Sequence, residues 1–260
     1  MSQSHSHSMK NLEITRIAAE RGVSPAQYDL ALCYYNGEGV EKDFLQAVKW
    51  WRKAAEQGHV RAQCSLGHCY FNGEGVPQDD VQAVSWYRKA AEQGYARGQG
   101  SMGYCYDGGF GVAMDEVQAV DWYLKAAEQG DVAAQCNLAN FYTTGRVSGK
   151  VLAKDPVQAV KWYRKAAEQG ESRAQYELGN IYYSGRGVTK DKIESYAYYK
   201  LSVSSAWKAQ NRFEIWNYAD GQLNACQSEM TEGQIAAGDK RVLELQKEIE
   251  AKIAAKKAGK

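Results

Sequence analysis

Hydrophobic and polar positions recur along the chain in units, and each unit carries two helical patterns. Within residues 62–72, Leu66, Gly67 and Tyr70 fall at i, i+1 and i+4, which places them on one face of a helix. The second pattern combines small alanines with aromatic residues: Ala83, Trp86, Tyr87, Ala90 and Ala91. Because alanines let neighbouring helices approach and aromatic rings fill the space between layers, each unit predicts a pair of packed helices.

The units follow one another at a nearly constant spacing. The string AAEQG ends at Gly58, Gly94, Gly130 and Gly170. The first helix of each unit is marked by Ala26, Ala62, Gly98, Ala134 and Ala174, which lie 36, 36, 36 and 40 residues apart. The spacing therefore predicts five repeats, over 26–61, 62–97, 98–133, 134–173 and 174–205. We expect the five helix pairs to stack, because no single pair can bury its apolar face alone.

Glycine and aspartate mark the helix ends within each repeat. A glycine stops the first helix at the position of a left-handed C-cap, at Gly37, Gly73, Gly109, Gly145 and Gly185. An aspartate followed three residues later by Gln or Glu opens the second helix in a capping-box arrangement, at Asp43, Asp79, Asp115, Asp155 and Asp191. Pro156 stands at the first helical position of the fourth repeat, where proline is favoured.

The two ends of the chain predict caps for the stack. Residues 1–9, with His5 and His7, are interpreted as a disordered or tag-like segment, and 10–25 as an N-terminal capping helix. Residues 206–260 are interpreted as a C-terminal helical cap. Its long helix opens on a capping box and carries Leu243, Gln246, Ile249 and Ile253 on one side. The predicted fold is an all-α, right-handed α/α solenoid of about five helix pairs with a capping helix and a long C-terminal helix.

The repeat unit A-Q-x-x-L-G-x-x-Y-x-x-G-x-G-V-x-x-D-x-x-x-A-V-x-W-Y-x-K-A-A-E-Q-G resembles the Sel1-like repeat, a relative of the tetratricopeptide repeat. The resemblance covers 26–205, and the stretch 230–236 resembles the tail that often ends bacterial members. The fourth repeat departs from the pattern by the insertion 143–155, and 206–229 match it poorly. The resemblance implies a non-enzymatic scaffold or adaptor that binds a peptide or protein in its concave groove. The alternative that it implies is a dedicated inhibitor or immunity protein against one secreted toxin or effector enzyme.

In such stacks the first helices line the concave face, so the positions between the core residues predict a binding surface. These positions hold Tyr28, Leu32, Tyr35, Asn36, His68, Phe71, Asn72, Tyr104, Asp107, Asn140, Thr143, Tyr176, Asn180 and Tyr183, together with Cys64 and Cys136. The set is rich in aromatic residues and asparagine and almost free of Lys and Arg. It therefore favours an extended peptide or a helix over a phosphate or carboxylate. The alternative is that these are half-packed helix residues.

The insertion in the fourth repeat adds a second candidate contact. Arg146, Lys150 and Lys154 make it basic, so it is either a contact for an acidic partner or a solvated loop.

Composition narrows the classes of partner. The net charge of +1 gives no strong field toward nucleic acid, and no run of about 18 apolar residues predicts membrane insertion. Cys33, Cys69 and Cys105 share one apolar repeat position, where neighbours about 8–10 Å apart are too distant for a disulfide. Reduced thiols and the lack of an apolar leader favour the cytoplasm, or the periplasm if a signal was removed. The oligomeric state is open, and a monomer is favoured.

No pattern of residues indicates catalysis or a cofactor. The repeated aspartates are explained as helix caps, and the Gly-x-Gly pairs follow helices and lack the lysine of a phosphate loop. Cys64, His68 and Cys69 form a small cluster, but a structural zinc ion wants four ligands. The sequence therefore predicts no enzyme, no metal and no cofactor.

Overall fold

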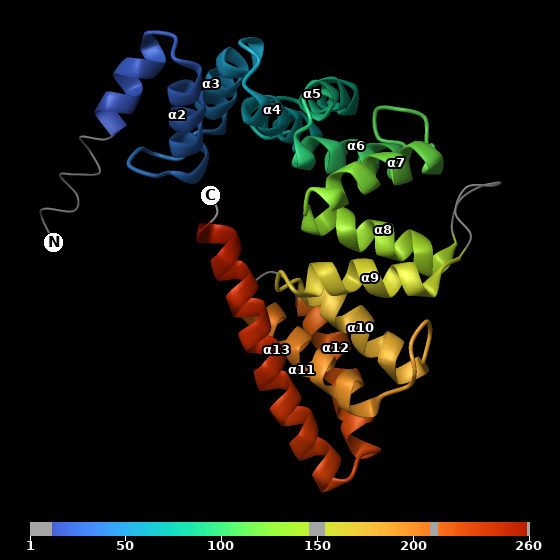
Figure 1. Cartoon of the computed structure of the whole chain (residues 1–260). Coiled ribbons are helices and arrows are strands. Elements are labelled where there is room, and N and C mark those ends of the chain that lie inside the picture. The colour runs from blue at the N-terminus through green and yellow to red at the C-terminus, as the bar shows by residue number, and fades with distance from the viewer. Residues whose placement is uncertain (1–11, 146–153, 209–212, 259–260) are drawn as a thin grey trace, which may run out of the picture. The chain divides into compact units, whose positions relative to one another are not determined.

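The structure is a computed structural model that describes residues 12–145, 154–208 and 213–258, and over this part of the chain it contains helices and turns without strands. After a helix over residues 12–20, the helices are α2 (Ser24–Asn36), α3 (Phe44–Glu56), α4 (Val60–Asn72), α5 (Asp80–Glu92), α6 (Ala96–Gly108), α7 (Glu116–Glu128), α8 (Val132–Thr144), α9 (Pro156–Ala167), α10 (Ser172–Ser184), α11 (Lys192–Lys208), α12 (Phe213–Ser228) and α13 (Glu232–Ala258) (Figure 1). The predicted all-α fold of repeated helix pairs is confirmed. The chain forms two compact units, unit 1 (Met1–Ala126) and unit 2 (Ala127–Lys260).

Each repeat pairs a first helix (α2, α4, α6, α8 and α10) with a second helix (α3, α5, α7, α9 and α11). The first helices begin two residues before the Ala-Gln marks, because Val23, His59, Tyr95, Asp131 and Glu171 are the N-cap residues. The predicted capping helix over 10–25 is shorter in the structure. Its helix ends at residue 20, because Gly22 has a left-handed φ of 88°, and α2 has already begun at Ser24.

The glycine and aspartate marks have the predicted roles, with one correction. Gly73 ends α4 in the left-handed region at φ 72°, and the Asp79 carboxylate accepts from the backbone N–H of Gln82 at 2.9 Å. The reciprocal half of the capping box is replaced by a different bond. The Asp79 N–H donates to the backbone carbonyl of Tyr70 at 2.9 Å, and Asp43, Asp115, Asp155 and Asp191 make the equivalent bond. The aspartate therefore closes the turn between the two helices of its repeat while it caps the second one.

The second glycine of the turn marks a close approach between consecutive repeats. A Cβ at Gly75 would lie 2.3 Å from the carbonyl oxygen of Phe44, at the start of the preceding second helix. At Gly111 it would lie 2.2 Å from the carbonyl oxygen of Asp80. Since no side chain fits at this distance, glycine is required at these two positions for the turn to rest on the first turn of the previous second helix.

A buried glutamine joins consecutive pairs by hydrogen bonds. Gln63 on α4 donates to the backbone carbonyl of Ala55, in the last turn of α3, at 3.2 Å. Its own carbonyl oxygen accepts from Gln93, which follows α5, at 2.7 Å. Gln27 and Gln135 make the two equivalent hydrogen bonds: each donates to a backbone carbonyl eight residues earlier and accepts from the glutamine that follows the second helix of its repeat. The Ala-Gln and AAEQG strings are therefore two halves of one interaction, which links each repeat to the one before it.

The C-terminal helices complete unit 2. The predicted capping box is confirmed, because the Thr231 N–H donates to Gln234 Oε1 at 2.9 Å and the Gln234 N–H donates back to Thr231 Oγ1 at 3.3 Å. The predicted packing face of α13 needs correction. Val242 and Leu245 are buried, whereas Leu243 is 59% exposed. The predicted Gln246, Ile249 and Ile253 are partly buried, and Ile253 lies next to Gly170, so the prediction is wrong at Leu243 alone.

Helix α13 is held to α11 by packing and by ion pairs. A Cβ at Gly238 would lie 2.5 Å from the ring of Tyr196, so the two helices are in close contact there. The Arg241 guanidinium lies 2.7 Å from the Glu194 carboxylate.

Candidate functional site

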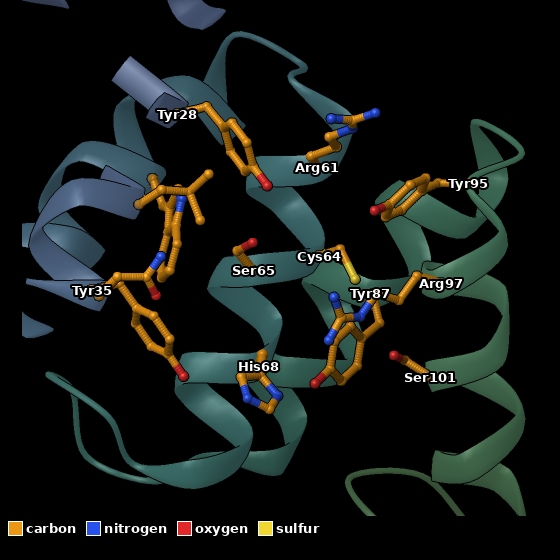
Figure 2. Close-up of a pocket in the computed structure, with 13 residues that line it drawn as sticks. Tyr28, Tyr35, Arg61, Cys64, Ser65, His68, Tyr87, Tyr95, Arg97 and Ser101 are labelled. Atoms are coloured by element: carbon orange, nitrogen blue, oxygen red, sulfur yellow. The ribbon is translucent and has the colours of Figure 1, made fainter. Parts of the chain in front are cut away.

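A pocket of about 180 Å³ lies on the first helices of unit 1 (Figure 2). We call it the α2–α4–α6 pocket, because most of its lining comes from these helices, together with residues next to them and two aromatic rings of the second helices. The lining residues are Tyr28, Leu32, Tyr35, Asn36, Trp51, Arg61, Cys64, Ser65, His68, Tyr87, Tyr95, Arg97 and Ser101. The pocket therefore draws on three consecutive repeats.

Aromatic packing positions the α2 side of this pocket. Tyr28 stacks on the ring of His59 with ring centroids 4.8 Å apart. The ring of Tyr35 lies 5.2 Å from that of Trp51. The Tyr35 hydroxyl donates to the Glu74 carboxylate at 2.9 Å, so this ring is fixed between α3 and the turn that follows α4.

The structure brings a subset of the predicted surface together in one site. Tyr28, Leu32, Tyr35, Asn36 and His68 all line the pocket, and Cys64 lies beside them. Their spacing along the sequence places them one repeat apart on adjacent first helices, which is why the repeat alignment could find them.

The other predicted residues of unit 1 lie outside the lining. The Asn72 amide lies 2.9 Å from Nε2 of His68, and Asp107 is half-buried on α6. Phe71 and Tyr104 pack with Phe110, which the sequence interpretation missed, at centroid distances of 5.2–5.8 Å.

The predicted residues of unit 2 are engaged with neighbours inside that unit. Asn180 Oδ1 accepts from the Tyr199 hydroxyl at 2.8 Å, and the Tyr183 hydroxyl donates to Glu229 at 2.6 Å. The ring of Tyr176 packs on that of Tyr199.

The remaining candidates of unit 2 lie on and just after α8. Thr143 donates to the backbone carbonyl of Ala139, and the carbonyl of Asn140 accepts from Thr144. Cys136 is buried. Of the predicted basic contacts in the insertion, Lys154 is exposed, and Arg146 and Lys150 lie outside the described residues.

The pocket contains two arginines that the predicted set of residues lacks. Arg61 and Arg97 both line it, one on α4 and one on α6. They escaped the sequence interpretation because it began these helices at Ala62 and Gly98, whereas the helices begin at Val60 and Ala96. The first turn of each helix, with its arginine, therefore belongs to the surface.

The electrostatic balance of the pocket is positive. Within the described residues, neither Arg61 nor Arg97 has a hydrogen bond or ion pair to another side chain, and no Asp or Glu is part of the lining. Burial lowers the pKa of His68, and Arg97 lowers it further against the opposing effect of Glu74. Burial, with the hydrogen bond to Glu74, raises the pKa of Tyr35 to about 12. Both rings are therefore uncharged near pH 7, and the arginines carry the charge.

The pocket also holds a buried donor. The indole Nε1–H of Trp51 has no hydrogen-bond acceptor among the described residues, and Trp51 is 3% exposed. The other repeats place a tyrosine at this position, which is Tyr87 in the second repeat.

The six cysteines form no disulfide in the structure. Cys33 is half-buried, and the other five are buried. Burial raises the pKa of Cys69 and of Cys105 to about 12, so both are protonated near neutral pH and poor nucleophiles. Among the residues that the structure describes, no cluster of three His, Cys, Asp or Glu side chains has the arrangement of a metal site. None of the described helices has the length and apolar character needed to cross a membrane.

Comparison with known proteins identifies the repeat. The Sel1 repeat model matches residues 24–59, 60–95, 96–131, 132–171 and 172–205, each range beginning two residues before the predicted repeat. A search of the curated proteins gives no match.

Solved structures share the fold. A Sel1 repeat protein from Oxalobacter formigenes is 33% identical, with a TM-score of 0.66 over 80% of this chain and 88% of that one. A protective antigen of uropathogenic Escherichia coli with an SLR fold is 30% identical, with a TM-score of 0.58 over 96% of this chain, which spans 58% of that protein's length. An immunity protein from Pseudomonas aeruginosa is 23% identical, with a TM-score of 0.51 over 75% of this chain and 73% of that one, and this likeness shows the fold alone. The chain belongs to the Sel1 repeat family.

Proposed function

We propose that this chain is a non-enzymatic interaction module that binds a segment of another protein in the α2–α4–α6 pocket. The observation that carries the proposal is a pocket built by three repeats, in which aromatic rings surround two arginines without internal partners. Sel1 repeat proteins are generally protein-interaction scaffolds, which supports a protein as the ligand.

The dimensions of the pocket suit a short stretch of chain. Adjacent packed helices lie about 8–10 Å apart, so three first helices span about 20 Å. An extended peptide rises about 3.3 Å per residue, so about six residues cross this surface. Tyrosine rings offer contact area at low entropic cost, and Ser65, Ser101 and Asn36 can bond to a peptide backbone.

The absence of enzymatic activity is part of the proposal. Cys64 is 5% exposed, which keeps its thiol from acting as an accessible nucleophile. The repeated aspartates are occupied as helix caps. We further propose that the chain works as a monomer in a reducing compartment. Six cysteines without a disulfide favour such a compartment.

The test is partner capture from native lysate with quantitative mass spectrometry. The pocket variant combines Tyr35→Ala, His68→Ala and Arg97→Gln, and Arg173→Gln serves as a control at the same repeat position in unit 2. The native chain and the control should retain a partner that the pocket variant loses, with unchanged circular dichroism. Equal capture by all three would refute the pocket as the binding surface. Capture of a single enzyme at one-to-one stoichiometry, with loss of that enzyme's activity, would instead identify a dedicated inhibitor.

A further inference from the structure

We propose that the α2–α4–α6 pocket recognises an acidic side chain, Asp or Glu, within the partner segment, with Arg97 as the principal contact and Arg61 as the second. This inference rests on the proposed function, because it names the chemistry that the same pocket selects.

The first observation is the position of the two arginines. Figure 2 shows Arg97 reaching from α6 toward the middle of the pocket, with Tyr35 and His68 on the opposite side. Arg61 projects from the first turn of α4 near Tyr95. Neither guanidinium has an acceptor among the described side chains, although the guanidinium of Arg241 in unit 2 pairs with Glu194. A guanidinium in a partly enclosed site binds a carboxylate well, because it can donate two parallel hydrogen bonds.

The second observation comes from comparing repeats. Arg61, Arg97 and Arg173 occupy the same repeat position. One helical turn later, the fifth repeat has Glu177, whereas the pocket has Ser65 and Ser101. Residues four apart on a helix are neighbours, so the fifth repeat carries a carboxylate one turn from its arginine, where it accepts from the Asn180 amide at 3.4 Å. The second and third repeats have serine at this position, and both serines line the pocket.

The charge count favours a carboxylate over a phosphate. Arg61 and Arg97 contribute two positive charges. Glu74, whose carboxylate accepts from the Tyr35 hydroxyl, contributes one negative charge at the edge of the pocket. His68 is neutral near pH 7, because burial and Arg97 lower its pKa. One net positive charge matches a singly charged carboxylate, whereas a phosphate monoester carries nearly two negative charges at pH 7.

The aromatic rings around the arginines favour particular residues on either side of the Asp or Glu in the partner segment. Tyr28, Tyr35 and Tyr95 line the pocket on both sides of α4. They offer apolar contact area on either side of the cations, so the segment should carry apolar or aromatic residues next to its Asp or Glu.

The experiment is a selection from a random twelve-residue peptide library displayed on phage, against the immobilised full chain. Four forms of the protein are used in parallel: the native chain, Arg97→Gln, Ser101→Glu and Arg173→Gln. Ser101→Glu copies the fifth repeat and places an internal carboxylate one turn from Arg97. Arg97→Gln removes the positive charge of Arg97, whereas Ser101→Glu keeps Arg97 and gives it a carboxylate within the protein. A synthetic form of the best peptide is then compared with its Asn or Gln counterpart by fluorescence anisotropy, with acetate and inorganic phosphate as competitors.

The native chain and Arg173→Gln should enrich Asp and Glu above their frequency in the library, and Arg97→Gln and Ser101→Glu should lose that enrichment. Replacing the acidic residue of the peptide by its amide should weaken binding about tenfold, as expected for a charged hydrogen bond. Peptides enriched without an acidic bias, or retained by both variants, would overturn this inference and leave the proposed function standing. Preferential displacement by phosphate would overturn the choice of a carboxylate. A native chain that enriches no peptide would overturn the proposed function and this inference together.

Discussion

Replacing a buried glutamine by leucine should change the free energy of unfolding in opposite directions in the second and fifth repeats. Gln63 uses both ends of its amide, donating to Ala55 and accepting from Gln93. Gln175 stands at the same position in the fifth repeat and donates to Ala167 at 3.4 Å, but its carbonyl oxygen is buried without a partner among the described residues. The reason is visible in the sequence, because Ser205 replaces the glutamine that follows the second helix in the earlier repeats.

The perturbation is Gln→Leu at each position, which nearly conserves volume. At Gln63 the change removes two hydrogen bonds worth about 1 kcal/mol each, and the added apolar burial returns about 1 kcal/mol. The expected result is a destabilisation of about 1 kcal/mol. At Gln175 the change removes one long hydrogen bond and also removes an unsatisfied buried acceptor, which costs about 1–3 kcal/mol. With the same return of about 1 kcal/mol from apolar burial, Gln175→Leu is expected to stabilise the chain by about 1–3 kcal/mol.

The assay is urea unfolding followed by far-ultraviolet circular dichroism. Native amide exchange on α4 and α10 accompanies it, because repeat arrays open locally. The urea midpoint for Gln63→Leu should fall, and that for Gln175→Leu should rise. A larger loss at Gln175 than at Gln63, or equal losses at both, would refute the assignment of the glutamines as links between repeats.

Three further perturbations follow from the structure. Burial raises the pKa of the Cys69 thiol to about 12, so this thiol should resist Ellman's reagent at pH 8 in the native chain and react in urea. Half-buried Cys33 should react first. Rapid labelling of Cys69 in the native chain would contradict its burial. Gly75→Ala should destabilise by more than about 2 kcal/mol in thermal melts, since it combines a left-handed φ with a backbone clash, and an unchanged melt would contradict that close approach. The Lys200 ammonium holds the pKa of Asp239 below its ordinary 3.8. The docking of α13 is therefore stabilised above pH 3.8 and weakens as the pH falls through the lowered pKa. Amide exchange on α13 should speed up over this pH range in the native chain, and this pH dependence should be absent in Asp239→Asn.

The fold was predictable because its determinants are local and repeated. The glycine caps, the aspartate caps and the 36-residue spacing each recur several times, so one pattern confirms another. The double role of Asp79 and the partners of Gln63 were not predictable, because they depend on which carbonyl a neighbouring helix presents. The prediction for α13 failed at Leu243 for a similar reason. Leu243 and Val242 are equally apolar, and only docking on α11 decides which one is buried.

The candidate site was predictable in part. Tyr28, Tyr35 and His68 were found because equivalent positions on adjacent first helices face the same side. Arg61 and Arg97 were missed because the predicted helices began two residues too late, which left both arginines outside the helical surface. The signal that could have found them is the N-cap residue before each helix, which places the arginine inside the first turn. This omission changed the predicted chemistry of the ligand.

The most direct test of the central claim, that the α2–α4–α6 pocket is the surface that binds another protein, is site-specific photocrosslinking. A benzoylphenylalanine replaces Ser65, which lines the pocket, or Ser85, which is exposed on α5 and serves as the matched control. In native lysate, irradiation should join one partner to the chain labelled at position 65 and not to the chain labelled at position 85. The peptide that joins to position 65 should contain an Asp or Glu. Adducts of equal yield at both positions, or none at position 65, would contradict the account.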